Sequence, residues 1–431
     1  RTSKETSVPF SAPSERVVEI DPSQLRPGLF IRLPSGWMNH PFLFNQFRIN
    51  SAEQVEIIQK LGLKTVQYLP ERSSTQALPR APATARPPPP PAAPSPAQQA
   101  ALEEKRQRAE RAAAQRQLIA KCEKRYQSAA LQIRDVMRNV FAAPARSVVA
   151  ARELVDSVME SFAAEAGLII HLMGDKVADD NAYFHSLNVM ILSLLVGRSL
   201  GLSPDELRTL GEGALFHDIG KTRVPDAVLR NPQRNRHEEE FFRLHTLYGA
   251  DIGRELQVLG PAVIEVILSH HETMDGKGYP NHLGGRQISL AARIVAITNR
   301  YDNLCNPLRQ DKAVTPAEAM TLMFKSEQAH WDPDLLQRFV RALGVYPPGS
   351  LVQLSNGNLG LVVAVDHADL LRPSVMIFDP AVPRNEALIV DLATERDVKV
   401  DAVVRPTEID PAALAYLAPR RRLSYFHGNP T

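Results

Sequence analysis

Histidine and carboxylate side chains recur at the ends of apolar helical segments in the middle of this chain. Burying such groups is costly unless something compensates their polar atoms. Neutral imidazole and carboxylate oxygen form a ligand set that suits divalent Fe, Mn, Zn or Ni. The candidate metal ligands are five histidines and one aspartate: His185, His217, Asp218, His245, His270 and His271.

The size of this set indicates more than one ion, because a tetrahedral site needs only four ligands. Two neighbouring metal ions can generate a hydroxide and hold a phosphodiester for in-line attack. Lys221 follows Asp218 closely and could neutralise a phosphate oxygen. Spacing and chemistry therefore predict a metal-dependent hydrolase. The alternative is a structural core with scattered histidines, and the pattern by itself does not name a substrate.

The segments that must position these residues are predicted to be helical. Ser203 to Glu206 and Thr315 to Glu318 each form a capping box with proline at the first helical position. Pro261 and Asp332-Pro333 open two more helices. No run between residues 146 and 345 alternates strongly enough to require a strand. We expect 146–345 to be one all-helical domain.

The amino-terminal part has a different composition. We expect a disordered tail at residues 1–16 and a small α+β regulatory domain at 17–72, with a half-buried strand around Ile31. Residues 73–98 are predicted to be a linker, because nine of the eighteen residues from Pro79 to Pro96 are proline. Residues 99–145 are rich in helix formers and predict a connecting helix. That helix would support a homodimer or pack against its own domain.

The carboxyl-terminal part, residues 346–431, is predicted to be a β-rich extension. Val352 and Leu354 alternate with polar residues, Asn356-Gly357 supplies a hairpin turn, and alternation resumes at Leu359. Further strands are expected near 374–378 and 387–392. The predicted fold class is multidomain and mainly α, with the helical domain flanked by an α+β unit and a β-rich extension.

Composition narrows the choice of partners and compartment. Fifty basic residues against 48 acidic ones give a net charge of +2, so no broad basic face for nucleic acid is expected. Two cysteines exclude a disulfide scaffold and favour a reducing compartment. The most apolar stretch, Val189 to Val196, is too short to span a membrane. We expect a cytoplasmic protein with no membrane or nucleic-acid partner.

Several motifs resemble one enzyme family. His217-Asp218, followed by Ile219-Gly220-Lys221, resembles the signature of the HD phosphohydrolase superfamily. His270-His271-Glu272, followed by Asp275 to Pro280, resembles the extended signature of the HD-GYP subfamily, the bacterial cyclic di-GMP phosphodiesterases. The resemblance runs from about residue 179 to 307. The amino-terminal unit resembles a domain of unknown function that often precedes HD-GYP domains.

This resemblance implies specific roles. The six candidate ligands would hold two divalent ions, Fe or Mn before Zn or Ni, with Asp218 bridging them and acting in catalysis together with Lys221. Lys221, Gly278, Tyr279 and Pro280 would border the substrate. The implied reaction is hydrolysis of cyclic di-GMP to pGpG and onward to GMP in second-messenger signalling. Protein partners would bind through the amino-terminal domain.

The chain departs from the family pattern at several positions. Asn299 occupies the place of the last metal-ligating aspartate; an amide oxygen can still bind a metal, but it is neutral and should weaken metal affinity. Asp302 lies near the same helical face. Asn181 stands where some members bind a third metal with glutamate, so two ions are expected. Arg309 either faces a substrate phosphate or lies at the surface.

These departures leave two alternatives. One is a catalytically weakened cyclic di-GMP sensor or protein-interaction module, motivated by Asn299 in place of the usual aspartate. The other is a phosphohydrolase acting on a different nucleotide, because the superfamily is broader than the subfamily. The Gly278-Tyr279-Pro280 segment argues against the second alternative.

Overall fold

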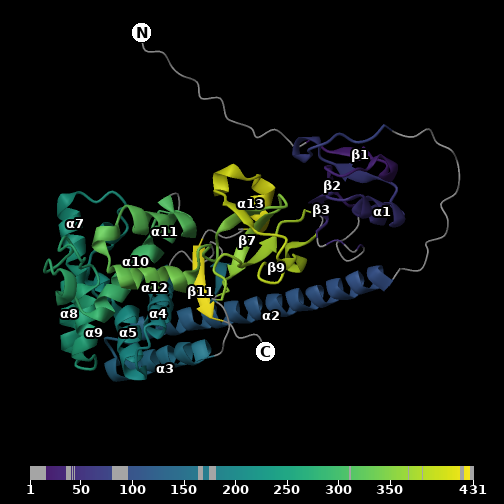
Figure 1. Ribbon diagram of the computed structural model, residues 1–431. Helices are drawn as coiled ribbons and strands as arrows, with labels where there is room; N and C mark the ends of the chain where they lie inside the picture. Colours follow the sequence, from purple (N-terminus) through teal and green to yellow (C-terminus); the bar gives the residue numbers. More distant parts are fainter. Residues whose placement is uncertain are drawn as a thin grey trace, which may run out of the picture.

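The computed structural model describes residues 16–34, 40, 42, 44–79, 96–163, 168–173, 181–309, 312–366, 368–380, 382–417 and 422–427. Almost all of the expected tail at 1–16, and residues 80–95 of the expected linker, lie outside the described residues. Figure 1 shows a small α+β unit, a β-rich part and a helical domain, with the long helix α2 running beneath the last two.

The amino-terminal unit is a four-stranded antiparallel sheet with one α-helix. Its strands are β1 (Val18–Ile20), β2 (Phe30–Arg32), β3 (Gln46–Arg48) and β4 (Val66–Tyr68), in the order β1-β4-β2-β3. Helix α1 (Ala52–Lys60) begins after Ser51, whose side chain accepts a hydrogen bond from the Gln54 amide. Ile58 on this helix packs into the core of the sheet. The small α+β unit predicted from the sequence is confirmed.

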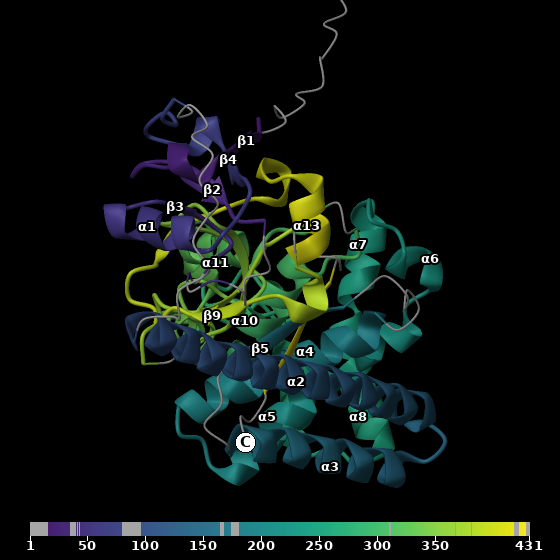
Figure 2. The ribbon, with the colours of Figure 1, turned by 90° about the vertical axis from the view of Figure 1, so that its right-hand side faces the viewer.

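Helices α2 to α12 build the central domain around α4, whose residues 186–197 are buried (Figure 1, Figure 2). The predicted capping boxes at Ser203 and Thr315 are both present. The mainly helical fold class is therefore confirmed. The helices are α2 (Pro96–Asn139), α3 (Pro144–Ala163), α4 (Asn181–Ser199), α5 (Pro204–Phe216), α6 (Asp226–Leu229), α7 (Arg236–Arg243), α8 (His245–Leu256), α9 (Pro261–Ser269), α10 (Leu290–Cys305), α11 (Pro316–Lys325) and α12 (Pro333–Leu343).

The β-rich part contains the predicted hairpin. Strands β6 (Leu351–Leu354) and β7 (Leu359–Ala364) pair antiparallel across a turn in which Gly357 has a φ of 81°. A residue with a side chain rarely adopts that conformation, which explains the glycine. The remaining elements are β8 (Ser374–Ile377), β9 (Ile389–Asp391), β10 (Val400–Val403), α13 (Pro411–Leu417) and β11 (Arg422–His427).

The expectation that residues 146–345 are wholly helical is wrong at one place. Strand β5 (Leu168–Met173) pairs antiparallel with β11 along its full length and touches β7 at Ile169. The sheet order is β10-β6-β7-β5-β11, with β8 joining β7 to β9. A short, nearly continuous apolar run carries neither helical nor strand periodicity, so the sequence pattern did not reveal it. The helical domain therefore contributes a strand to the β-rich part.

The amino-terminal unit contacts the β-rich part (Figure 1, Figure 2). Phe44 is buried in the apolar cluster that contains Val362. Asn45 Nδ2 donates to Asp379 Oδ2 at 2.6 Å, and the Arg72 guanidinium donates to the Gly357 carbonyl. Among the helices within the described ranges, none is both long and apolar enough to cross a membrane.

Candidate metal centre

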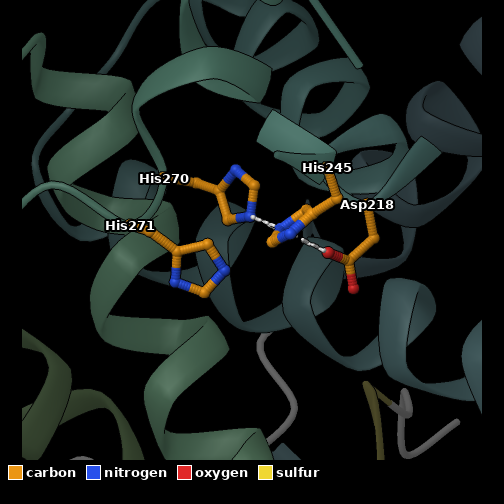
Figure 3. Close-up of side chains that lie close together, drawn as sticks. All are labelled: Asp218, His245, His270 and His271. Atoms are coloured by element: carbon orange, nitrogen blue, oxygen red, sulfur yellow. Dashed lines mark hydrogen bonds and ion pairs between the residues drawn. The ribbon is translucent and has the colours of Figure 1, made fainter. Parts of the chain in front are cut away.

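The six predicted metal ligands converge from four places in the helical domain. His185 lies in α4; His217 and Asp218 lie between α5 and a 3₁₀ helix at Ile219–Arg223; His245 begins α8; and His270-His271 follow α9. Figure 3 shows Asp218, His245, His270 and His271 facing a common space. The side chains of His217, His245 and His270 are at most 1% exposed.

Backbone carbonyls fix the proton on three of these imidazoles. Because a carbonyl oxygen only accepts, each Nδ1 must carry the hydrogen and each Nε2 must present its lone pair. His185 has the same tautomer, since its Nδ1 lies 2.6 Å from Asp302 Oδ2. The carbonyl contacts are His217 Nδ1 to Ala214 O (2.7 Å), His245 Nδ1 to Phe242 O (2.7 Å) and His270 Nδ1 to Ile267 O (2.8 Å).

These lone pairs are directed toward one another. His185 Nε2 lies 3.2 Å from His217 Nε2, and His245 Nε2 lies 3.4 Å from His270 Nε2. Two unprotonated nitrogens cannot share a hydrogen bond and repel each other at such distances. A cation beside each pair removes the repulsion, so the donor set fits metal ions.

Asp218 lies between the two histidine pairs. Its Oδ2 is 3.3 Å from His217 Nε2 and 3.6 Å from His185 Nε2, while its Oδ1 is 3.4 Å from His245 Nε2. Oδ1 is buried and has no hydrogen-bond partner among the described residues. The ligand atoms thus form two groups that share Asp218: one with His185 and His217, the other with His245, His270 and His271.

Electrostatics keep Asp218 and three of the histidines in metal-binding form. Burial lowers the pKa of His245 to about 4 and holds those of His270 and His271 well below the usual value. Burial alone would raise the pKa of Asp218, but the adjacent Lys221 ammonium opposes burial, and this pKa lies well below its usual value. Neutral imidazole and charged carboxylate are the forms that metals require.

The segment after α9 folds back over the histidines. The Tyr279 ring stacks on His271 with centroids 4.6 Å apart and planes 16° apart, and the Tyr279 amide donates to the His271 carbonyl (3.2 Å). Glu272, 1% exposed, accepts from the amides of Asn281 (2.7 Å) and Leu283 (3.0 Å). The buried Glu272 thereby fixes the loop that carries Gly278, Tyr279 and Pro280.

Cationic side chains gather beside this loop. Lys221 Nζ lies 2.5 Å from Asp218 Oδ2. The Arg243 guanidinium lies 5.0 Å from the centroid of the Tyr279 ring, within the range of a cation–π interaction. The Arg234 guanidinium lies 3.8 Å from the centroid of Phe242. Arg234 and Arg243 share one carboxylate, that of Glu239, at 3.6 Å and 3.3 Å, so these two guanidinium groups keep a net positive charge beside the loop.

Helix α10 contributes Asp302 to the centre. Asn299 is 3% exposed, and its Oδ1 accepts from Asn303 Nδ2 at 2.6 Å. Its role as a metal ligand stays a prediction, as does the role of the half-buried Arg309. The sequence reasoning missed Asn188, whose Nδ2 donates to Asp302 Oδ1 at 2.7 Å. An asparagine within an apolar helix gives no sequence signal for such a contact.

A helical domain that carries His217-Asp218 and His270-His271 in this arrangement is typical of the metal-dependent HD domains. Residues 171–335 match the HD domain family, and residues 17–151 match a domain of unknown function, DUF3391. The cyclic di-GMP phosphodiesterase PA4108 of Pseudomonas aeruginosa is 32% identical over 83% of this chain and 84% of its own length. The chain belongs to the HD-GYP family, and the resemblance noted in the sequence is confirmed.

Two further similarities cover smaller parts of the chain. The 3'3'-cGAMP-specific phosphodiesterase 3 of Vibrio cholerae is 28% identical over 45% of this chain and 41% of its own length. Among solved structures, the HDG"Y"P protein Bd1817 of Bdellovibrio bacteriovorus has a TM-score of 0.42 and 17% identity, and the match covers 75% of this chain and 98% of that one.

Proposed function

We propose that this chain hydrolyses cyclic di-GMP at a centre of two divalent metal ions. The observation that carries the proposal is the sharing of Asp218 by two groups of histidine ligands. One ion would bind His185, His217 and Asp218 Oδ2. The other would bind Asp218 Oδ1, His245, His270 and His271. Fe and Mn suit this set of imidazoles and one carboxylate, with Zn and Ni as further candidates.

When bound, such ions supply an activated water and polarise the phosphodiester. The chain's own residues would prepare the site for this chemistry. Asp218 would hold both ions through its two oxygens. Lys221 already lies against Asp218, and its ammonium can also donate to a phosphate oxygen. Asn299 Oδ1 already accepts a hydrogen bond from Asn303 Nδ2, and its second lone pair would be the one offered to an ion.

The surroundings of the centre suit an anionic substrate with two phosphates. Gly278, Tyr279 and Pro280 form the loop above His271, and Arg243 lies over the Tyr279 ring. With one phosphodiester held at the metal centre, the second phosphate of a cyclic dinucleotide would lie near the cationic side chains of Arg234 and Arg243. Arg309 is proposed as a further contact to that phosphate. The products would be pGpG and then GMP.

The comparisons support hydrolysis over a purely sensory role, because PA4108, which matches 83% of this chain, is a cyclic di-GMP phosphodiesterase. The similarity to a cGAMP-specific enzyme makes that dinucleotide the competing substrate to be compared. We further propose that residues 17–72 receive a protein partner and that α2 supports a homodimer.

The test is hydrolysis by purified variants. Asp218→Ala and His217→Ala should abolish turnover of cyclic di-GMP and reduce metal content. His237→Ala is the matched control, because His237 lies on α7 with a side chain that is 95% exposed. It should retain full activity. If the Asp218 and His217 variants hydrolyse as fast as the parent, the assigned site is wrong.

A further inference from the structure

A chain of buried hydrogen bonds connects helix α2 to the metal-site residue His185. The Tyr126 hydroxyl donates to Asn188 Oδ1 at 2.7 Å, and Asn188 Nδ2 donates to Asp302 Oδ1 at 2.7 Å. Asp302 Oδ2 in turn accepts from His185 Nδ1 at 2.6 Å. Tyr126, Asn188 and Asp302 are at most 2% exposed and come from α2, α4 and α10.

The direction of each bond is determined by the groups involved. A carboxylate only accepts hydrogen bonds and an amide NH₂ only donates them, so Asn188 must turn Nδ2 toward Asp302. Its Oδ1 then points to Tyr126, whose hydroxyl donates. The reversed amide would set two oxygens against each other. The Asp302 carboxylate therefore selects this orientation, and the Tyr126 hydroxyl stabilises it by donating to Asn188 Oδ1.

Asp302 determines the tautomer and the ring orientation of His185, and therefore which nitrogen is available to a metal. Its carboxylate also accepts from Asn306 Nδ2 at 2.8 Å, so two amides hold it in place. The bond to Nδ1 keeps the proton there and leaves Nε2 directed toward His217 and Asp218. A carboxylate behind a ligating histidine raises the basicity of that histidine, and losing such a partner typically weakens metal binding about 10- to 100-fold.

Tyr126 also packs directly beside the metal-site segment. Its ring lies parallel to that of Phe184, at 5.7 Å between centroids and 9° between planes, and Phe184 precedes His185. Helix α2 follows the linker that leaves the amino-terminal unit. Any shift of α2 along or around its axis would move the ring and the hydroxyl together.

We propose that Tyr126 is a positioning residue of the metal centre, acting through Asn188 and Asp302 on His185. This inference rests on the proposed function, because it requires that His185 bind a metal. It makes metal affinity depend on the position of α2, which gives events at the amino-terminal unit a physical route to the active centre.

The test is Mn²⁺ binding to the metal-free full-length chain by isothermal titration calorimetry, which needs no substrate. Tyr126→Phe keeps the ring and removes the hydroxyl, and it should weaken the His185 site about 10-fold. Tyr68→Phe is the control, because it also removes a hydrogen-bonded hydroxyl, to Thr75 O, but in the amino-terminal unit. The control should bind Mn²⁺ like the parent.

A double-mutant cycle with Asp302→Asn identifies the route. If Tyr126 acts through Asp302, Tyr126→Phe should cost little further affinity in the Asp302→Asn background. Equal losses in both backgrounds, or parent-like affinity of Tyr126→Phe, would overturn the inference. If Tyr126→Phe does not fold, Asn188→Ala interrupts the same chain and takes its place. A parent that binds no Mn²⁺ would instead refute the proposed metal centre.

Discussion

Replacing Gly278 by alanine should separate the Tyr279 loop from the metal-site backbone. A Cβ at this position would lie 2.5 Å from the His271 carbonyl oxygen and 2.5 Å from the Thr273 amide nitrogen. Non-bonded carbon contacts settle near 3.5–4.0 Å, so the two backbone segments must move apart by about 1 Å. The neighbours are backbone atoms and cannot rotate away. The Tyr279–His271 hydrogen bond and ring stacking would both be lost.

The expected result is a fall in kcat of about 100-fold, the effect of a 1 Å misplacement at a reacting centre. Overpacking should also cost about 1–3 kcal/mol of unfolding free energy. The assay is cyclic di-GMP turnover with metal content measured on the same sample. Gly284→Ala is the control, since its Cβ would meet its nearest neighbour at an ordinary 3.4 Å. Parent-like turnover of Gly278→Ala would refute the account of the loop.

Three further predictions concern residues in and beside the candidate metal centre: Asn299, Arg243 and His245. Asn299→Asp should restore a negative charge and raise metal affinity, as measured by chelator competition; unchanged affinity would mean that Asn299 is not a ligand. Arg243→Gln should raise KM for cyclic di-GMP while leaving bis(p-nitrophenyl) phosphate hydrolysis unchanged, whereas Arg236→Gln, on the same helix with a comparable glutamate pair at 2.9 Å, should change neither. The pKa of His245 falls from 6.5 to about 4 on folding, so the unfolded chain binds the proton first as the pH drops. Urea unfolding of the metal-free protein should therefore show that this group lowers the free energy of unfolding by about 3 kcal/mol between pH 7 and pH 4. An unfolding free energy that does not change with pH would contradict the burial of His245 as a neutral imidazole.

The candidate metal ligands could be identified from the sequence because much of the cluster is local. The two residues of each pair, His217-Asp218 and His270-His271, are adjacent in the chain. Each pair directly follows a helix whose start is marked by proline, at Pro204 and at Pro261. The carbonyl three residues before each helix-terminal histidine then sets its tautomer, as at His217 and Ala214. Such features follow from helix geometry and need no knowledge of distant contacts.

What the sequence could not reveal depends on contacts between distant segments. Strand β5 pairs with β11 across about 250 residues, and neither carries a periodic pattern that names its partner. The contact of Phe44 with the β-rich part, and that of Tyr126 with Asn188, likewise join separate elements. From the sequence alone, a tyrosine in a long helix is predicted to be an ordinary packing residue, because the partner of its hydroxyl is known only from the fold.

The most direct test of the central claim combines elemental analysis with turnover on one sample. Purified full-length protein, supplied with Mn²⁺ or Fe²⁺ under anaerobic conditions, should contain about two metal ions per chain, the number that its two ligand groups can hold. The same sample should convert cyclic di-GMP to pGpG or GMP. A metal-replete protein that binds cyclic di-GMP and leaves it intact would contradict the account.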